Sequence, residues 1–345
     1  MVKPKVHLTR LKIDNSDAEE TLRKALNKFQ WKKIVRQGAM VTIKVNATHF
    51  EYLPGLTTTP ELVAAYVRIL RDRAERVIVG DSDLQRVCGE MALEGCKIQD
   101  IVEKEGAEVL NFSKDKMELV DIGGEVLKKM KMPKCYIDCD VFSSMPVFKT
   151  HKLTKVTLTL KNHFGCIPDD HRFRYHRVIH QVLADITKFI NPRLIVMDGR
   201  IGLESDGPIA GLPKKLGLLL VADNCVAADS VACHIMGFDP NIVEHIVHAR
   251  NRGLGPTELN KIDVTGLSIA KAKNPFEPAG EDIISKFERL INPHPLWSKM
   301  IYKSPLFTTM KFIAWKVREA SGYKSKYVER VKKTGLWENY QGLFE

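Results

Sequence analysis

The sequence predicts an α/β fold: a doubly wound, mostly parallel sheet with helices on both faces, followed by a helical, basic C-terminal extension. Short apolar runs rich in Val and Ile alternate with segments of helical periodicity along the first 266 residues. Several of these runs end in polar or glycine-containing segments, which is typical of parallel strands that present ligand-binding loops. Together the two patterns favour a single α/β body over an all-helical or all-β protein.

The first quarter of the chain alternates strands and helices. A helix with apolar positions at Leu22 and Leu26 follows the first strand, and another begins at Pro60 with Thr59 as its N-cap. The predicted strands lie at 5–11, 39–46 and 76–83. This order of elements is that of a doubly wound sheet.

The middle of the chain supplies the remaining elements. A buried strand is expected at 141–148, and the polar segment 149–165 follows it directly. Later elements are a helix at 171–190, a strand at 193–198, a loop at 199–213, a strand at 216–223, a helix at 224–237 and a strand at 261–266. Residues 88–106 have helical periodicity as well.

We divide the chain into three parts. The body spans 1–266, a linker 267–289, and a basic aromatic extension 290–345. The extension holds ten Lys or Arg against four Glu, so it carries more than half of the net charge of +11. The loops expected to build a site are 44–60, 80–83, 149–176, 198–213 and 223–229.

Composition narrows the function classes. The chain has no run of ~18 apolar residues and no signal-peptide pattern, so a cytoplasmic location is expected, with peripheral membrane contact through 290–345 as an addition. Seven scattered cysteines indicate reduced thiols. The positive charge favours anionic partners. Nucleic acid is not an expected partner, because no nucleic-acid recognition motif occurs.

One candidate anion site combines a strand end with a helix start. Lys44 and Asn46 end the second predicted strand, and the hydroxyl run Thr57, Thr58 and Thr59 precedes a helix. Free N–H groups at a helix N-terminus favour a phosphate or carboxylate. A plain helix cap is the alternative for Thr59. Neither GxxxxGK[ST] nor a GxGxxG after the first strand occurs, so the usual nucleotide fingerprints are absent.

The central segment 149–165 is the strongest candidate site. It contains Lys149 and His151, and then Lys161-Asn162-His163 with Gly165 nearby. A desolvated lysine can serve as nucleophile or base, and a histidine can transfer protons or bind metal. The alternative is a solvated basic loop.

Carboxylates and further histidines could complete the site. Asp198, Glu204 and Asp223 follow predicted strands and are expected to line the wall opposite the lysines. His176 and His180 are four residues apart on a predicted helix, which is a weak metal-binding pattern without an accompanying HExxH carboxylate. Asp223 as a helix cap and His180 as a structural residue remain alternatives.

Five segments resemble a prokaryotic family known as domain of unknown function 362. They are KVN at 44–46, TTTPELV at 57–63, VFKTHKLTKVTLTLKNHFG at 147–165, VMDGRIGLESDGP at 196–208 and DNCVAADSVACHIMG at 223–237. The resemblance covers about residues 38–256. Many members carry a ferredoxin module, but this chain lacks the C-x2-C-x2-C-x3-C-P run, so no internal iron–sulfur cluster is expected.

The family is also distantly similar to the N-terminal domain of nickel-dependent lactate racemase. That resemblance implies that Lys161 falls near the lysine that carries a nickel-pincer nucleotide and His151 near an upstream histidine. The glycines of that domain are replaced here by Thr157, Leu158 and Thr159. Fold can be shared where chemistry is not.

These observations give two hypotheses. In the first, the protein binds an anionic small molecule or cofactor around 149–165, with His151 and Lys161 as catalytic residues in racemase-like or redox chemistry. The cofactor, whether a metal or a nucleotide derivative, is not determined by the sequence. In the second, the chain is a non-catalytic module that docks on a redox partner protein or an acidic membrane through 290–345.

Overall fold

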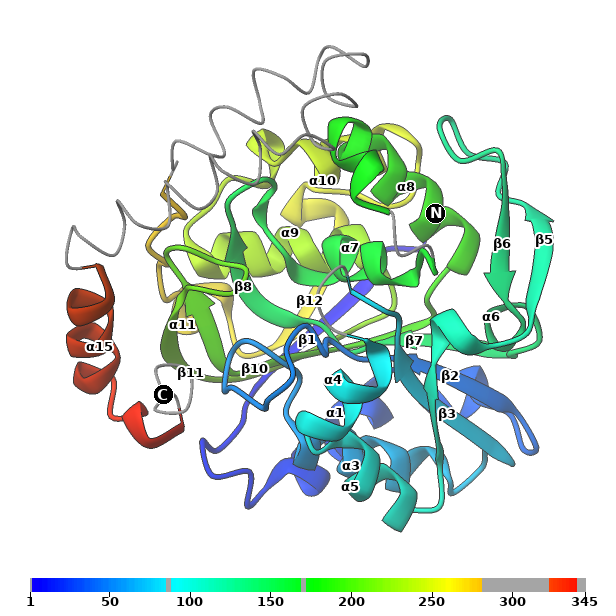
Figure 1. The fold of residues 1–345 in the computed structure, drawn as a ribbon, viewed down its shortest axis with the longest axis horizontal. Helices are drawn as coiled ribbons and strands as arrows, with labels where there is room; N and C mark the ends of the chain where they lie inside the picture. The colour runs from blue at the N-terminus through cyan, green and yellow to red at the C-terminus, as the bar shows by residue number, and fades with distance from the viewer. Residues whose placement is uncertain (1, 85–87, 169–171, 281–322, 340–345) are drawn as a thin grey trace.

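The computed structural model of the protein describes residues 2–84, 88–168, 172–280 and 323–339 (Figure 1). A large twisted sheet forms the centre, and helices cover it on both sides. The predicted α/β class is therefore confirmed.

The main sheet runs in the order β12-β1-β11-β10-β7-β2-β3-β4, with β8 paired to β10 and β9 paired to β8. Most neighbours are parallel, and the antiparallel pairs are β1 with β11, β10 with β11, and β8 with β9. The strands are β1 (Lys5–Arg10), β2 (Met40–Lys44), β3 (Arg76–Asp81), β4 (Glu108–Asn111), β7 (Val141–Ser144), β8 (Val147–His151), β9 (Lys155–Val156), β10 (Leu194–Glu204), β11 (Leu212–Ala222) and β12 (Asp263–Gly266). A separate hairpin joins β5 (Met117–Asp121) to β6 (Lys129–Pro133).

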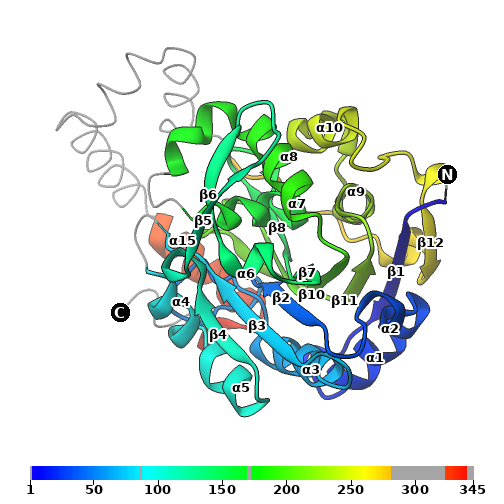
Figure 2. The same cartoon turned by 90° about the vertical axis from the view of Figure 1, so that its right-hand side faces the viewer.

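Helices from the two halves of the chain cover opposite faces of the sheet. Figures 1 and 2 show α1, α3 and α5 on one side and α8, α9 and α10 on the other. The helices are α1 (Ala18–Lys28), α2 (Trp31–Ile34), α3 (Pro60–Leu70), α4 (Gly89–Gly95), α5 (Ile98–Lys104), α6 (Lys134–Ile137), α7 (Leu158–Asn162), α8 (Ile179–Ile190), α9 (Cys225–Met236), α10 (Glu244–Asn251), α11 (Ile269–Ala272) and α15 (Tyr323–Lys333).

The alternation of side chains along β2 separates the core from the site. Val41 and Ile43 point into the apolar cluster shared with α1 and α3. Thr42 and Lys44 are buried too, but they lie on the opposite face, where Thr42 donates to Cys135 O in α6 and Lys44 to Asn162 in α7. Because successive side chains of a strand point to opposite faces, the polar side chains of β2 lie together on one face.

The strand predicted at 141–148 is divided in the structure. Met145 and Pro146 separate β7 from β8, and both strands pair with β10 in parallel. Because proline has no N–H to give to a ladder, it favours this interruption. Lys149 and His151 therefore belong to strand β8, where the sequence predicted a loop.

The loop predicted at 199–213 is a second correction. Strand β10 continues to Glu204 and β11 begins at Leu212, so the glycine-rich segment forms most of a long antiparallel hairpin. The register shifts between Gly199 and Ile201, which identifies a bulge. Glycines in a strand often mark such a bulge. The same glycines are also typical of a loop, which is why the sequence predicts one here.

Two predicted helices are shorter than expected. The helical segment 88–106 consists of α4 and α5 with Cys96 and Lys97 between them. The helix predicted at 171–190 is a 3-10 turn over Arg172–Val178, followed by α8. His176 and His180 thus lie in different elements and do not form the predicted pair on one α-helix.

The C-terminal segments contact the body where they are described. The predicted linker contains α11, and Phe276 packs into the apolar cluster beneath α9. In α15, Val331 is buried against Leu53, Leu203 and Leu212. Most of the predicted extension, 290–322 and 340–345, lies outside the described residues. Within the described part of the chain, no helix has the length and apolarity needed to cross a membrane.

Candidate functional site

A cavity of about 550 Å³ opens where β2, β3 and β8 end. Its walls contain Lys44, Lys149 and Lys161 together with Arg172, and Asp81 supplies a carboxylate. A second hollow of about 610 Å³ lies between α1 and α3. There Arg23 and Arg68 already pair with Glu19, and we do not treat the hollow as a site.

Lys44 forms a buried ion pair with Asp81. Its Nζ lies 2.8 Å from Asp81 Oδ1 and donates hydrogen bonds to Val45 O and Asn162 Oδ1, at 2.7 and 3.2 Å. The second oxygen of Asp81 accepts a hydrogen bond from the N–H of Ala47 at 2.9 Å. Neighbouring parallel strands carry the two charges to the same edge of the sheet, and almost no surface of either remains exposed.

Lys149 is fully buried, and no carboxylate among the described residues forms an ion pair with its ammonium. The Nζ donates to Asn46 Oδ1 and Leu56 O, each at 2.9 Å, and lies 3.4 Å from Thr48 Oγ1. Burial, followed by the charges of Lys161 and Lys44, lowers the pKa of Lys149 to about 7. A substantial fraction of this amine is therefore neutral at physiological pH.

Lys161 lies in the last turn of α7 and faces the cavity. Its Nζ is 4.5 Å from the centroid of the Phe164 ring, and among the described residues it has no hydrogen-bond partner. Burial and the charges of Arg172 and Lys44 lower the pKa of Lys161 to about 7. A lysine with a lowered pKa and a free Nζ can act as a base or nucleophile.

Asp229 on α9 positions the helix that carries Lys161. Its two oxygens accept hydrogen bonds from the N–H groups of Thr159 and Leu160, at 2.8 and 2.9 Å, and so cap α7. Burial raises the pKa of Asp229 to about 7. The sequence placed Asp229 among the strand-end carboxylates of the loop 223–229, with a solvent-facing side chain as the alternative. Its role as a cap of α7 was not predicted, because a carboxylate inside a helix of Ala and Val gives no local sign of a tertiary cap.

Two of the three histidines that line the cavity, His151 and His176, are neutral. His151 Nδ1 accepts a hydrogen bond from the N–H of Leu153 at 3.0 Å, which leaves the ring proton on Nε2. Burial and the charge of Lys161 hold the pKa of His151 well below its usual range. His176 lies against the Phe164 ring, with centroids 5.5 Å apart, and burial lowers its pKa to about 3.

Arg172 adds another cation that the sequence analysis missed. It is buried, donates to Ile167 O at 2.8 Å and lies 5.8 Å from the Phe164 ring centroid. Among the described residues that line the cavity, four basic side chains face one carboxylate, Asp81. The basic stretch around Arg172 was visible in the sequence, but only the fold shows that this arginine turns inward.

Gly165 leaves the space that the Lys44–Asp81 pair occupies. A Cβ on Gly165 would lie 2.8 Å from Lys44 Nζ and 2.9 Å from Asp81 Oδ1. We expect Gly165→Ala to lower the free energy of unfolding by about 1–3 kcal/mol through overpacking. Urea denaturation measures this change, and a variant as stable as the wild type would contradict the close approach.

Several predicted site residues lie elsewhere. The Thr57–Thr59 run does not line the cavity: Thr58 Oγ1 bonds Met145 O, and the N–H of Thr59 bonds Asp198 Oδ2. His163 is buried between Thr187 and Ser144, and burial lowers its pKa to about 3. These residues hold the strands and helices around the site together.

The acidic wall predicted opposite the lysines does not form. Asp198 caps α3, Glu204 pairs with Lys214 at 2.7 Å, and Asp223 accepts a hydrogen bond from the N–H of Lys5. The reason is the correction to β10: because the strand continues past Asp198, that side chain lies within the sheet and not at its edge. Lys44, Asn46, Lys149, His151, Lys161, Asn162 and Gly165 do share the cavity.

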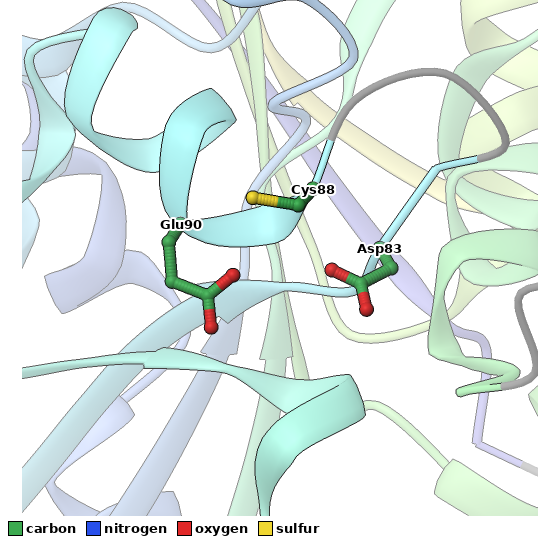
Figure 3. A group of neighbouring side chains, drawn as sticks. All are labelled: Asp83, Cys88 and Glu90. Carbon is green, nitrogen blue, oxygen red and sulfur yellow. The ribbon is translucent and has the colours of Figure 1, made fainter.

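A different group of side chains has metal-ligand spacing. Figure 3 shows Asp83, Cys88 and Glu90 around the start of α4, with ligand atoms within 4.8 Å of one another. Asp83 accepts hydrogen bonds from Gly89 N and Asn111 Nδ2, and Glu90 accepts one from Asn111 Nδ2. These bonds account for the arrangement as a cap of α4.

Comparison with known proteins places the chain in a family. Residues 41–234 match the family described as Domain of unknown function (DUF362), and the matched segment is more than half of the chain. The chain belongs to this family. The family predicted from the sequence is therefore confirmed. The matched region contains α7 and most of the cavity.

Two individual proteins resemble parts of this DUF362 member. The thylakoid-associated protein sll1697 of Synechocystis sp. is 26% identical over 214 residues, which is 58% of this chain and 63% of the relative. The lactate racemase apoprotein of Thermoanaerobacterium thermosaccharolyticum is 15% identical, with a TM-score of 0.38 over 57% of this chain and 50% of that chain.

Proposed function

We propose that this DUF362 member binds a small dianionic molecule in the cavity and that Lys161 and His151 act on it. The observation that carries the proposal is the excess of buried positive charge. Asp81 offsets Lys44, but Lys149, Lys161 and Arg172 have no carboxylate of their own among the described cavity residues. With both lysines partly protonated near pH 7, about two positive charges remain to be neutralised.

Uncompensated charges of one sign are costly in a desolvated site. The charges of Lys44, Lys161 and Arg172 lower the pKa of neighbouring lysines because like charges repel. Burial removes the water that would screen this repulsion. A bound dianion supplies the missing charge and raises the pKa of both lysines. Carboxylate and phosphate groups share this chemistry, and Arg172 can hold either through paired N–H donors.

The residues around this charge favour proton transfer next to a carboxylate. The neutral Nζ of Lys161 can remove a proton from the carbon beside the carboxylate, and the C–H electron pair passes into the carboxylate as an enolate. Lys149 and Arg172 hold the oxygens, and the Nε2–H of His151 donates a hydrogen bond to the developing charge. Return of the proton to either face of the carbon completes a racemisation or an exchange.

Isothermal titration with oxalate and phosphate as dianions, and acetate as a monoanion, tests binding. We expect the dianions to bind more tightly and their affinity to fall above pH 7, because the lysines then lose the protons that attract the ligand. Lys161→Met should weaken oxalate binding about tenfold or more. Lys188→Met, which removes an exposed lysine on α8, is the matched control.

Equal affinity of wild type and Lys161→Met for oxalate, or an affinity that does not change between pH 6 and 9, would contradict the proposal. Labelling with acetic anhydride across the same pH range gives a second readout. A reactive Nζ with a midpoint near pH 7 at Lys161 is the expected pattern.

A further inference from the structure

A completely buried imidazole lies behind the cavity. His245, in the first turn of α10, has no exposed surface, and neither of its ring nitrogens has a hydrogen-bond partner among the described residues. Buried polar atoms are nearly always paired, and exceptions often have a functional cause. His245 does not line the cavity, so ligand binding alone does not explain it.

His245 is stacked on a second histidine, and its helix α10 contacts α7, the helix of the cavity lysine. The charges of His180 and Lys161 both act on it and, with burial, hold its pKa well below its usual range. Its ring is stacked on that of His180, with centroids 6.2 Å apart and planes inclined by 17°. Figures 1 and 2 both show α7, which carries Lys161, beside α8 and α10.

His180 continues the series to the protein surface. Its Nε2 is 3.3 Å from Glu244 Oε2, and the Glu244 side chain is 71% exposed. His180 Nδ1 has no partner among the described residues, and a third ring, His248, is also stacked on His180, with centroids 6.4 Å apart. The series thus runs from a solvent-exposed carboxylate to a buried ring.

We propose that His245 and His180 form a proton relay that connects Lys161 to the solvent at Glu244. This inference rests on the proposed function, in which Lys161 changes its protonation state. Three features of the structure carry it: a buried ring without partners, a stacked second ring, and an exposed carboxylate on that second ring. The charge of Lys161 near His245 argues against a metal ion there, since a cation would add to it.

Each transfer leaves both rings neutral. Glu244 passes a proton from solvent to Nε2 of His180, and His180 releases the proton of its other nitrogen toward His245. His245 accepts this proton on one ring nitrogen and releases another toward the Nζ of Lys161, which changes from amine to ammonium. The ring centroids of His180 and His245 are 6.2 Å apart, a separation that one bridging water can span.

The relay matters most when a ligand fills the cavity. A bound dianion raises the proton affinity of Lys149 and Lys161 while it occupies the side of the site that opens to solvent. A relay through His245 gives the proton that these lysines take up a path that does not cross the ligand.

Stopped-flow mixing of the full chain with oxalate tests the relay. At about pH 8 oxalate is fully ionised, so a pH indicator dye reports the protons taken up by the protein. His245→Phe removes both ring nitrogens, and His245→Gln keeps a hydrogen-bonding side chain that cannot shuttle protons. Both variants should slow proton uptake about tenfold or more, with the oxalate affinity and the total uptake unchanged. His234→Gln, a half-buried histidine on α9, is the control.

Normal uptake rates in both His245 variants would overturn the relay and leave anion binding intact. No oxalate binding by the wild type would overturn the proposed function itself. If the His245 variants fail to fold, His180→Phe replaces them, because its ring is partly exposed. An unchanged uptake rate in His180→Phe would likewise overturn the relay.

Discussion

Replacing Lys161 by methionine should stabilise the protein while weakening its binding of anions. Its folded-state pKa of about 7 lies below its ordinary value of 10.5, so the folded protein disfavours the charged form. At pH 7 the lowered pKa of Lys161 reduces the stability of the wild type by on the order of 3 kcal/mol. This is less than the full pKa difference would give, because the cavity is open to water. Methionine fills a similar volume against Phe164 and leaves no hydrogen-bond partner unpaired, because among the described residues Lys161 has none.

The pH dependence of this gain has a definite sign. Between the two pKa values the unfolded chain binds more protons at Lys161, so the stability of the wild type rises with pH from about 7 to about 10.5. The advantage of Lys161→Met should be complete at pH 7 and nearly gone by about pH 10. Urea denaturation at several pH values measures it, and a variant less stable than wild type at pH 7 would contradict the assignment.

Lys149→Met gives the matched contrast. Its Nζ donates to Asn46 Oδ1 and Leu56 O, so methionine leaves two buried acceptors unpaired. The relief of the buried charge is then offset by these lost hydrogen bonds. Lys161→Met should be the more stable of the two variants.

Replacing Asp81 by asparagine should destabilise the protein by about 3–5 kcal/mol, because Lys44 then stays buried without its counter-charge. Asp81 also accepts hydrogen bonds from the N–H groups of Ala47 and Ser82, and an amide can satisfy only part of this set. Denaturation at neutral pH measures the loss. Phosphate should restore part of the stability, since the anion supplies negative charge beside Lys44.

An exposed ion pair supplies the control for Asp81→Asn. Arg76 and Glu108 are 2.7 Å apart, and both side chains are about half exposed. Glu108→Gln should cost less than about 1 kcal/mol. Equal effects of the two substitutions would show that the Lys44–Asp81 pair is not shielded from water.

The fold class followed from the sequence because strands such as 76–83 have a strong local pattern. Local patterns failed where tertiary pairing decided the outcome. The glycines at 199 and 202 indicated a loop, yet β11 pairs with this segment and makes it a strand. The division of 141–148 at Pro146 was likewise missed, because an apolar run gives no sign of which strand it will join.

The site was predictable in one part. Lys44, Lys149 and Lys161 belong to strand ends and a short helix, and the general rule that ligands bind at the carboxyl edge of a parallel sheet brings them together. Arg172, Asp81 and the cap formed by Asp229 depend on contacts between residues far apart in sequence. Periodicity and composition carry no information about such contacts.

The pairing of β1 affects the order in which the molecule can be completed during synthesis. This strand is made before its partners β11 and β12, which are more than 200 residues further along the chain. Until residue 266 has left the ribosome, Lys5–Arg10 has an unpaired edge on at least one side. The sheet is therefore complete only when β12 pairs with β1. Shortened chains that end before β12 leave that edge of β1 unpaired and prone to aggregation.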